Sequence, residues 1–266
     1  MKKWLIHQPP EEAAKQIRSG SDLSMLCAQV LASRGMHNVQ EVAAFLQCDG
    51  LADPFLTADM ETAADYINQA MYSGSRICIY GDYDCDGVTA TVILYSYLLE
   101  LGANVTYRIP ERDEGYGLNT NAVREMHEDG VELIVTVDNG ITALEEAELI
   151  AELGMTLVIT DHHQPLEMLP RAAAIVDAHR ADDTSPFHDL CGAGVALKLV
   201  AALDGGDTAM ALEQFGELAA IATVADVVTL SGENRYLVQL GLRLLANTER
   251  PGLLALLDKS GLTGKA

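Results

Sequence analysis

The sequence predicts an α/β fold: a parallel sheet with helices on both faces, flanked by helical segments at both ends of the chain. From Arg76 onward, short apolar runs alternate with amphipathic stretches of helical spacing. This rhythm is typical of parallel strands joined by crossover helices. Residues 11–74, and the chain after Asp189, show helical spacing without such strands. We therefore expect an N-terminal helical segment packed on the core (1–75), an α/β domain (76–230), and a helical extension (231–266) leading toward a further domain.

Each element follows from its local pattern. Apolar residues recur at helical spacing in Asp22–Ser33, Val39–Leu46 and Met60–Tyr72, with a break at residues 51–54. The strands that we expect are Ile77–Tyr80, Asn104–Ile109, Leu133–Val137, Thr156–Thr160 and Ala173–Val176. Helices are expected between them over Val88–Leu101, Asn119–Glu128 and Ala143–Leu153. After a polar loop to Asp189, further helices are expected over Val195–Leu203, Ala209–Ala225, Arg235–Asn247 and Gly252–Asp258.

Composition narrows the class of protein. No apolar run approaches the roughly 20 residues that span a bilayer, and the start MKKWLIHQPPEEAA does not have the pattern of a signal peptide. The cysteines are odd in number and lack CxxC spacing, which favours reduced thiols and a cytoplasmic location; they are Cys27, Cys48, Cys78, Cys85 and Cys191. A net charge of −22 argues against a nucleic-acid binder. Bound divalent cations, or a basic surface elsewhere in a longer protein, would weaken that objection.

The run GDYDCDG, residues 81–87, is the centre of the predicted site. Asp82, Asp84 and Asp86 follow an apolar strand at alternate positions, and a helix follows them. Three carboxylates so close together repel one another unless cations lie among them. The tip of a strand before a helix is also where open α/β sheets bind their ligands. We therefore expect half of a metal site here.

Polar groups also end the later strands. Asp138 follows Val137, the triplet Asp161-His162-His163 follows Thr160, and Asp177 follows Val176, while Asp226 interrupts an apolar helical stretch. A single strand-end aspartate is more often a helix N-cap, by roughly two to one. Here, however, several parallel strands present such groups at one edge. Carboxylates and imidazoles without thiolates suit Mn²⁺ or Mg²⁺, and one carboxylate that bridges two cations about 3.5–4 Å apart is the arrangement of metal-assisted phosphoester hydrolysis.

Four ordered motifs then resemble those of the DHH phosphoesterase family: GDYDCDG, VDNG (137–140), TDHH (160–163) and TVADVV (223–228). The surrounding stretches ERDEGYGLN (111–119), LCGAGVALKL (190–199) and GENR (232–235) are similar to its single-strand-specific DNA exonucleases, as are LASRG (31–35) and LADPF (51–55). The resemblance covers nearly the whole chain and implies a Rossmann-like DHH domain over residues 76–230.

The resemblance also implies roles by position. The implied metal ligands are Asp82, Asp84, Asp138, His162 and Asp226, with Asp138 bridging both metals. Asp138 and His163 are the implied catalytic residues, and His163 contacts the scissile phosphate. Asp86 and Asp161 are expected to support the metal ligands without binding metal themselves, with Asp161 orienting His162 or His163. Gly192 and Gly194 either let backbone amides approach a phosphate or serve tight packing, and both interpretations stand equally. Arg108, Arg112 and Tyr116 either contact DNA or are structural.

The implied activity is in-line hydrolysis of a phosphodiester by water activated between two divalent cations. The family implies release of mononucleotides from the 5′ end of single-stranded DNA, in repair and recombination, with single-stranded DNA as partner and no membrane. The alternatives are a phosphodiesterase acting on short oligonucleotides or cyclic dinucleotides, a pyrophosphatase, and an inactive scaffold. Every motif aspartate and histidine is present, which weighs against the scaffold.

Three departures from the family pattern stand out. An Asn-Pro pair is more usual within Ile175–Ala178, and a proline is more usual at Thr229. The chain also stops soon after the last motif, where relatives continue. We therefore expect a truncated catalytic core, or a natural short form, with intact chemistry and weak affinity for DNA.

Overall fold

The computed structural model describes residues 10–46 and 50–262, which fall into two units divided after residue 49. In the first unit, α1 (Glu11–Ser19), α2 (Met25–Ser33) and α3 (Val39–Leu46) surround a small apolar core. The residues between this division and the predicted boundary at residue 75 belong to the unit that contains the sheet. The functional boundaries at residues 75 and 230 stay predictions.

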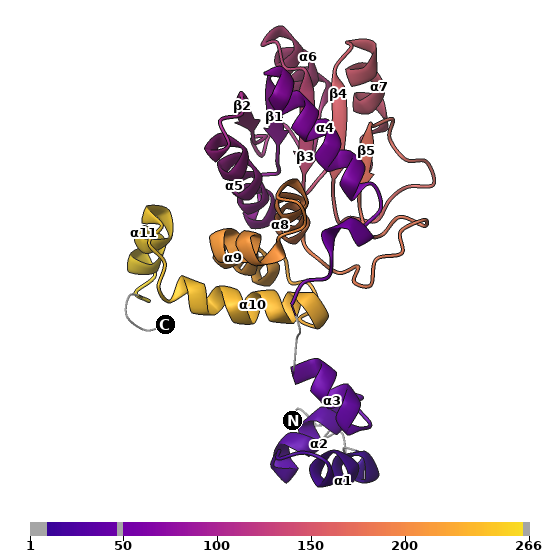
Figure 1. Ribbon diagram of the computed structural model, residues 1–266, viewed down its shortest axis with the longest axis vertical. Coiled ribbons are helices and arrows are strands. Elements are labelled where there is room, and N and C mark those ends of the chain that lie inside the picture. Colours follow the sequence, from indigo (N-terminus) through magenta and orange to yellow (C-terminus); the bar gives the residue numbers. More distant parts are fainter. Residues whose placement is uncertain (1–9, 47–49, 263–266) are drawn as a thin grey trace, which may run out of the picture. The chain divides into compact units, whose positions relative to one another are not determined.

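Five parallel strands form the sheet of the second unit (Figure 1). They are β1 (Ile77–Tyr80), β2 (Val105–Arg108), β3 (Leu133–Val137), β4 (Thr156–Thr160) and β5 (Ala174–Val176). Their spatial order is β2-β1-β3-β4-β5. Strand β2 therefore lies on one side of β1, and strands β3, β4 and β5 follow one another on the other side. That reversal, between β1 and β3, is where sheets of this topology form a ligand crevice.

Alternate strand residues supply two separate cores. In β1, Ile77 and Ile79 face one core, while Cys78 and Tyr80 face the other. The same alternation holds in β3, where Val135 and Ile134 lie in different cores. Because both faces are covered, the central strands β1, β3 and β4 are buried and mostly apolar, as in parallel sheets generally, whereas the edge strand β2 is more exposed and ends in Arg108. The predicted fold class is confirmed.

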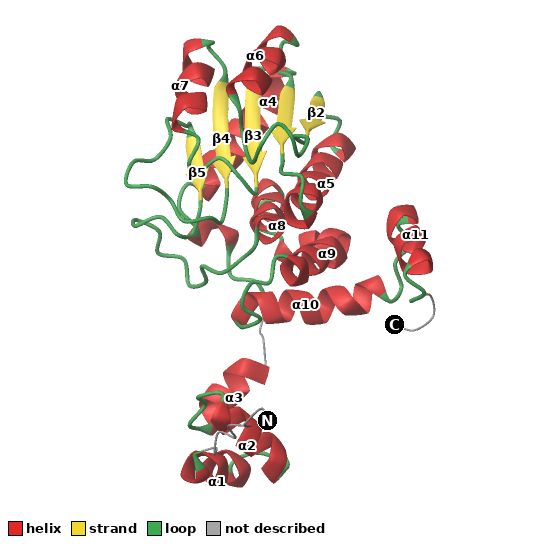
Figure 2. Ribbon diagram, turned by 180° about the vertical axis from the view of Figure 1, so that it is seen from behind, coloured by secondary structure: helices red, strands yellow, loops and turns green. Residues whose placement is uncertain are grey.

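Helices cover both faces of the sheet (Figure 2). On one side lie α4 (Met60–Ser73), α5 (Cys85–Glu100) and α8 (Gly192–Leu203), with α9 (Thr208–Ala225) packed behind α5 and α8. On the other side lie α6 (Thr120–Glu128) and α7 (Leu144–Glu152). The remaining elements are a short 3₁₀ helix (Pro54–Leu56), α10 (Gly232–Leu245), which packs on α9, and α11 (Pro251–Lys259). Among the described residues, no helix is both long and apolar enough to cross a membrane.

Besides α10, which starts at Gly232 and not at Arg235, two helices begin three residues earlier than the apolar pattern predicts. Helix α5 starts at Cys85 because Asp84 caps it, accepting hydrogen bonds from the amides of Asp86 and Gly87 at 2.9 Å each. Helix α8 starts at Gly192 and not at Val195. In both cases the first turn is built from polar or small residues, which carry no periodic apolar signal.

Candidate active site

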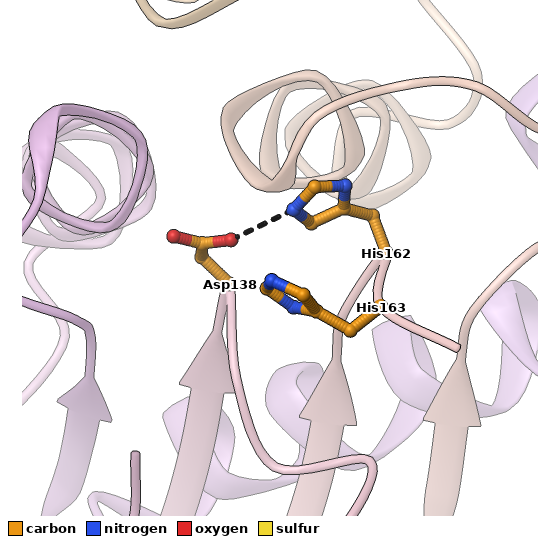
Figure 3. Close-up of side chains that lie close together, drawn as sticks. All are labelled: Asp138, His162 and His163. Atoms are coloured by element: carbon orange, nitrogen blue, oxygen red, sulfur yellow. Dashed lines mark ion pairs between the residues drawn. The ribbon is translucent and has the colours of Figure 1, made fainter. Parts of the chain in front are cut away.

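The carboxyl ends of β1, β3 and β4 bring the predicted motifs to one place. Asp138 follows β3, and the two histidines follow β4, so that their side chains meet across the gap between the strands (Figure 3). The Nε2 atom of His162 lies 3.1 Å from Oδ1 of Asp138, 3.6 Å from Oδ2 of Asp86 and 3.8 Å from Oδ2 of Asp226. Residues separated by more than a hundred positions along the chain thus form one cluster.

The turn after β3 aims Asp138 into the cluster. Asp138 has a φ of 63°, in the left-handed region that non-glycine residues rarely adopt. The next side chain holds the turn, because Nδ2 of Asn139 donates to the carbonyl oxygens of Tyr80 at 3.2 Å and Val137 at 2.9 Å. Asn139 therefore joins the tip of β3 to the tip of β1. The sequence flagged it only as a member of the VDNG motif, and gave no sign of this bond.

The ligand atoms form two main groups that fit two cations. One group is Asp82, Asp84 and Asp138, and the other is Asp86, His162 and Asp226; within each, the ligand atoms lie within 4.8 Å of one another. Asp138 also groups with His162 and His163, so it stands between the two main groups. The carboxylate and imidazole donors suit Mn²⁺ or Mg²⁺.

Electrostatics supports the same interpretation. Burial, followed by the charges of Asp86 and Asp84, raises the pKa of Asp138 well above its usual range. Burial also raises the pKa values of Asp82 and Asp226. Moreover, Oδ1 of Asp82, Oδ1 of Asp138 and Nε2 of His162 are buried without a partner in hydrogen-bond geometry. A divalent cation offsets such repulsion and satisfies such atoms, so the residues present fit the implied metals.

His163 differs from His162 in its surroundings. Its Nδ1 lies 2.7 Å from Oδ1 of the buried Asp161, and its ring is about half exposed. This hydrogen bond is the main cause that raises the pKa of His163, although burial opposes it. Burial pushes the pKa of Asp161 upward, but hydrogen bonds from His163 and from the amides of Ile141 and His162 outweigh it, and the pKa is lowered. Asp161 is thus hydrogen-bonded to one of the two histidines, and its role in orienting that ring for a reaction stays a prediction.

Asp86 is closer to the cluster than expected. It belongs to the group with His162 and Asp226, and was expected only in a supporting place. Its two oxygens also accept hydrogen bonds from the amides of Gly192, at 2.6 Å, and Ala193, at 2.7 Å. The amide of Gly192, which was considered for a substrate phosphate, is therefore engaged by a side chain of the site itself.

The two glycines of α8 differ in how much room they leave for a side chain. A Cβ atom on Gly192 would lie 2.4 Å from Cβ of Asp138, and one on Gly194 would lie 3.1 Å from Cδ2 of Leu190. The first distance is incompatible with any side chain unless Asp138 moves. Tight packing thus suffices to explain Gly192, whereas Gly194 meets only the side chain of Leu190, and a role of either glycine in substrate binding stays a prediction.

The three candidate substrate contacts lie in different settings. The hydroxyl of Tyr116 donates to the carbonyl oxygen of Asp138 at 3.0 Å and lies 3.2 Å from Nδ1 of His163, so it belongs to the site. Arg108, at the end of β2, forms ion pairs with Glu114, at 2.9 Å, and with Glu125. The guanidinium of Arg112 lies over the ring of Tyr83, 5.1 Å from its centroid. Their contacts with DNA stay predictions.

Two further residues have local roles. Asp177 is buried, its Oδ1 accepts a hydrogen bond from the amide of His179 at 2.8 Å, and it is in none of the ligand groups found among the described residues. It thus caps a turn in a loop, and not a helix as the N-cap interpretation expects. Burial, with the charges of Asp86 and Asp84, raises the pKa of Cys85, which makes its thiol a poor nucleophile.

Comparison with known proteins identifies the family. The model of the DHH family, N-terminal domain, matches residues 76–228. The chain belongs to the DHH family. This DHH-family chain is 42% identical over 262 residues to the single-stranded-DNA-specific exonuclease RecJ of Bacillus subtilis, covering 97% of this chain and 33% of that protein. It therefore spans about a third of the length of that relative.

Solved structures of RecJ are also similar to this chain. The structure of RecJ from Thermus thermophilus in complex with Mn²⁺ matches with a TM-score of 0.78 and 30% identity, over 97% of this chain and 37% of that one. The complex of the same protein with Mg²⁺ matches with a TM-score of 0.66 and 26% identity, over 97% and 34%. The predicted membership of the DHH phosphoesterase family, and the relation to RecJ, are confirmed.

Proposed function

We propose that this DHH-family chain hydrolyses phosphodiester bonds with two divalent cations, and that it acts as a 5′ to 3′ exonuclease on single-stranded DNA. The observation that carries this is the pair of ligand groups on either side of Asp138, with the half-exposed His163 beside them. When bound, Mn²⁺ or Mg²⁺ would activate water and neutralise charge on the phosphoryl group. The proposed ligands are Asp82, Asp84, Asp138, His162 and Asp226, and we add Asp86 because of its place in the second group.

The protein's own groups then have distinct tasks. His163 faces solvent at the edge of the ligand cluster, and its raised pKa favours the charged imidazolium. In that form it can donate a hydrogen bond to a phosphoryl oxygen, where negative charge develops during hydrolysis. Asp161 keeps the ring in one orientation through the 2.7 Å bond to Nδ1, and Nε2, which lies 3.3 Å from the hydroxyl of Tyr116, is the atom proposed to face the substrate. Tyr116 contacts the same ring and limits its rotation.

The finer substrate assignment rests on the relatives. They are named as single-stranded-DNA-specific exonucleases, and their similarity extends over nearly the whole of this chain. The direction of cleavage, the role in DNA repair and recombination, and the cytoplasmic location are part of the proposal and come from the resemblance.

The net charge of the chain, and the share of its relative that it spans, favour one alternative function. The chain has a net charge of −22 and spans about a third of the Bacillus subtilis relative. Affinity for nucleic acid depends largely on contacts between cations of the protein and phosphates. A phosphodiesterase acting on dinucleotides or other short oligonucleotides needs fewer such contacts, so it is the alternative that we retain.

Hydrolysis of a 5′-labelled single-stranded oligonucleotide with Mn²⁺ tests the proposal. The same assay is run with the duplex, a dinucleotide and pyrophosphate. Stepwise release of nucleotides from the single strand, abolished in Asp138→Ala, is the expected result. Cleavage of the dinucleotide alone would replace the exonuclease by the short-substrate enzyme. No hydrolysis of any substrate by a folded, Mn²⁺-binding protein would refute the proposal.

A further inference from the structure

The stretch Gly232-Glu233-Asn234, at the start of α10, lies outside the ligand cluster but is tied closely to its support. Gly232 has a φ of 47°, and a Cβ atom there would lie 2.8 Å from the ring of Phe187. Glu233 forms a buried ion pair with Lys198 of α8, with an N–O distance of 2.8 Å. The beginning of α10 is thus anchored to α8 and to the loop before it.

Asn234 joins two separate segments through one side-chain amide. It is fully buried, and its Nδ2 donates to the carbonyl oxygen of Asp189 at 2.5 Å and to that of Thr229 at 3.1 Å. Both partners are acceptors, so the position requires a donor with two hydrogens. An aspartate of the same shape would place an oxygen against two carbonyl oxygens.

The two segments carry parts of the ligand cluster. Asp189 stands three residues before Gly192, whose amide donates to Asp86 at 2.6 Å. Thr229 stands three residues after Asp226, whose Oδ2 lies 3.8 Å from Nε2 of His162. A single amide therefore links the backbone that supports Asp86 to the backbone that carries Asp226.

The segment after Asp226 also needs such a restraint. Val227 has a φ of 61° and an exposed side chain. The left-handed conformation is unfavourable for a β-branched residue, and strained residues persist only where the surrounding structure imposes them. The exposed side chain of Val227 supplies little packing. The bond from Asn234 to Thr229 restrains this segment by hydrogen bonding, and Val228 adds packing against the apolar core.

We propose that Asn234 is a positioning residue for Asp226, holding that carboxylate at the cation site by clamping the segment after α9 to the segment before α8. This inference rests on the proposed function, because it assumes that Asp226 binds a cation. It assigns a task to one residue of the GENR motif, through hydrogen bonds to Asp189 and Thr229.

The test is titration of MnCl₂ into the metal-free full chain, followed by calorimetry and by electron paramagnetic resonance of free Mn²⁺. Asn234→Asp is expected to weaken Mn²⁺ binding about 10- to 100-fold, the usual effect of losing a residue that orients a ligand. Asn234→Ser, which keeps one donor, should lie between this variant and the wild type. Leu237→Ala is the control, since Leu237 is buried on the same helix but has no side-chain hydrogen-bond donor for either clamped segment. It should lower the melting temperature and leave Mn²⁺ affinity unchanged.

A double-mutant cycle shows whether Asn234 acts through Asp226. If it does, Asn234→Asp combined with Asp226→Asn binds Mn²⁺ within about twofold of Asp226→Asn alone. Additive losses would overturn the inference, as would wild-type affinity in both Asn234 variants with only a lower melting temperature. If Asn234→Asp does not fold, Asn234→Ser takes its place in the cycle. Absence of Mn²⁺ binding by the wild type would refute the proposed function itself, which is a different result.

Discussion

The substitution Gly192→Ala tests how closely the bridging carboxylate is packed. The new Cβ atom would lie 2.4 Å from Cβ, 2.7 Å from Oδ1 and 2.8 Å from Cα of Asp138. Ordinary contacts between carbon atoms are about 3.5–4.0 Å, so one of the two residues must move by roughly 1 Å. Gly192 also donates its amide to Asp86, and the first turn of α8 is thereby held in place. We therefore expect Asp138 to be displaced.

The magnitude follows from this overlap. Inserting one methyl group into a packed site costs about 1–3 kcal/mol of unfolding free energy. Gly192 does not have a positive φ, so alanine meets no backbone penalty there and the whole cost is steric. Misplacing a reacting group by about 1 Å costs on the order of 100-fold in rate. We expect a decrease of about that size in kcat/KM with Mn²⁺ on the single-stranded oligonucleotide.

Gly194→Ala is the matched control on the same helix. Its Cβ atom would meet only the side chain of Leu190, at 3.1–3.2 Å, and a leucine side chain can rotate away. We expect the unfolding free energy from urea titration to change by less than about 1 kcal/mol, with kcat/KM within a few-fold of the wild type. Equal activity of Gly192→Ala and the wild type would refute the packing argument.

Three further changes have defined outcomes. Asp138→Asn removes a carboxyl group whose ionised form is disfavoured in the folded metal-free protein, so folding no longer has to take up a proton there and thermal unfolding should occur at a higher temperature. Mn²⁺ at about 100 times its Kd should stabilise the wild type by about 2.7 kcal/mol but not this variant; equal stabilisation of both would contradict the assignment. Because the pKa of His163 is raised in the folded state, the pair with Asp161 stabilises the metal-free protein fully below about pH 6.5, and this stability is lost as the pH rises through the folded pKa. Asp161→Asn should lower the His163 pKa in an NMR titration, and an unchanged value would exclude the bond as its cause. Val227→Gly should raise the unfolding free energy in urea by up to about 1 kcal/mol, because relief of roughly 1–2 kcal/mol of strain exceeds the entropic cost of glycine; a decrease would show that Val227 is not strained.

The strands were predictable because their signal is local. Ile77–Tyr80, Leu133–Val137 and Thr156–Thr160 have the expected bounds, since each is a continuous apolar run enclosed by polar residues or glycine. The starts of α5 and α8 were not predictable in the same way. Their first turns contain residues that belong to the site or contact it, such as Asp86 and Gly192, and these residues interrupt the apolar period.

The cluster itself was predicted as a set of residue types at one sheet edge. What the sequence could not show is how those residues support one another. The bonds from Asn139 to Tyr80, from Gly192 to Asp86 and from Asn234 to Thr229 join positions that only the folded chain brings together. No spacing rule relates such pairs, so they appear only once the tertiary structure is known.

The distribution of ligands along the chain has a consequence for biosynthesis. Asp82 and Asp226 lie at opposite ends of the DHH region and belong to different ligand groups. Translation at roughly 5–20 residues per second takes on the order of ten seconds to pass from one to the other. During the later part of that interval, the emerging polypeptide carries all residues of the first group, Asp82, Asp84 and Asp138, but lacks Asp226 of the second. Binding at the second group should therefore report the last stage of maturation, and a ribosome-bound chain arrested before Asp226 should retain less Mn²⁺ than the released protein.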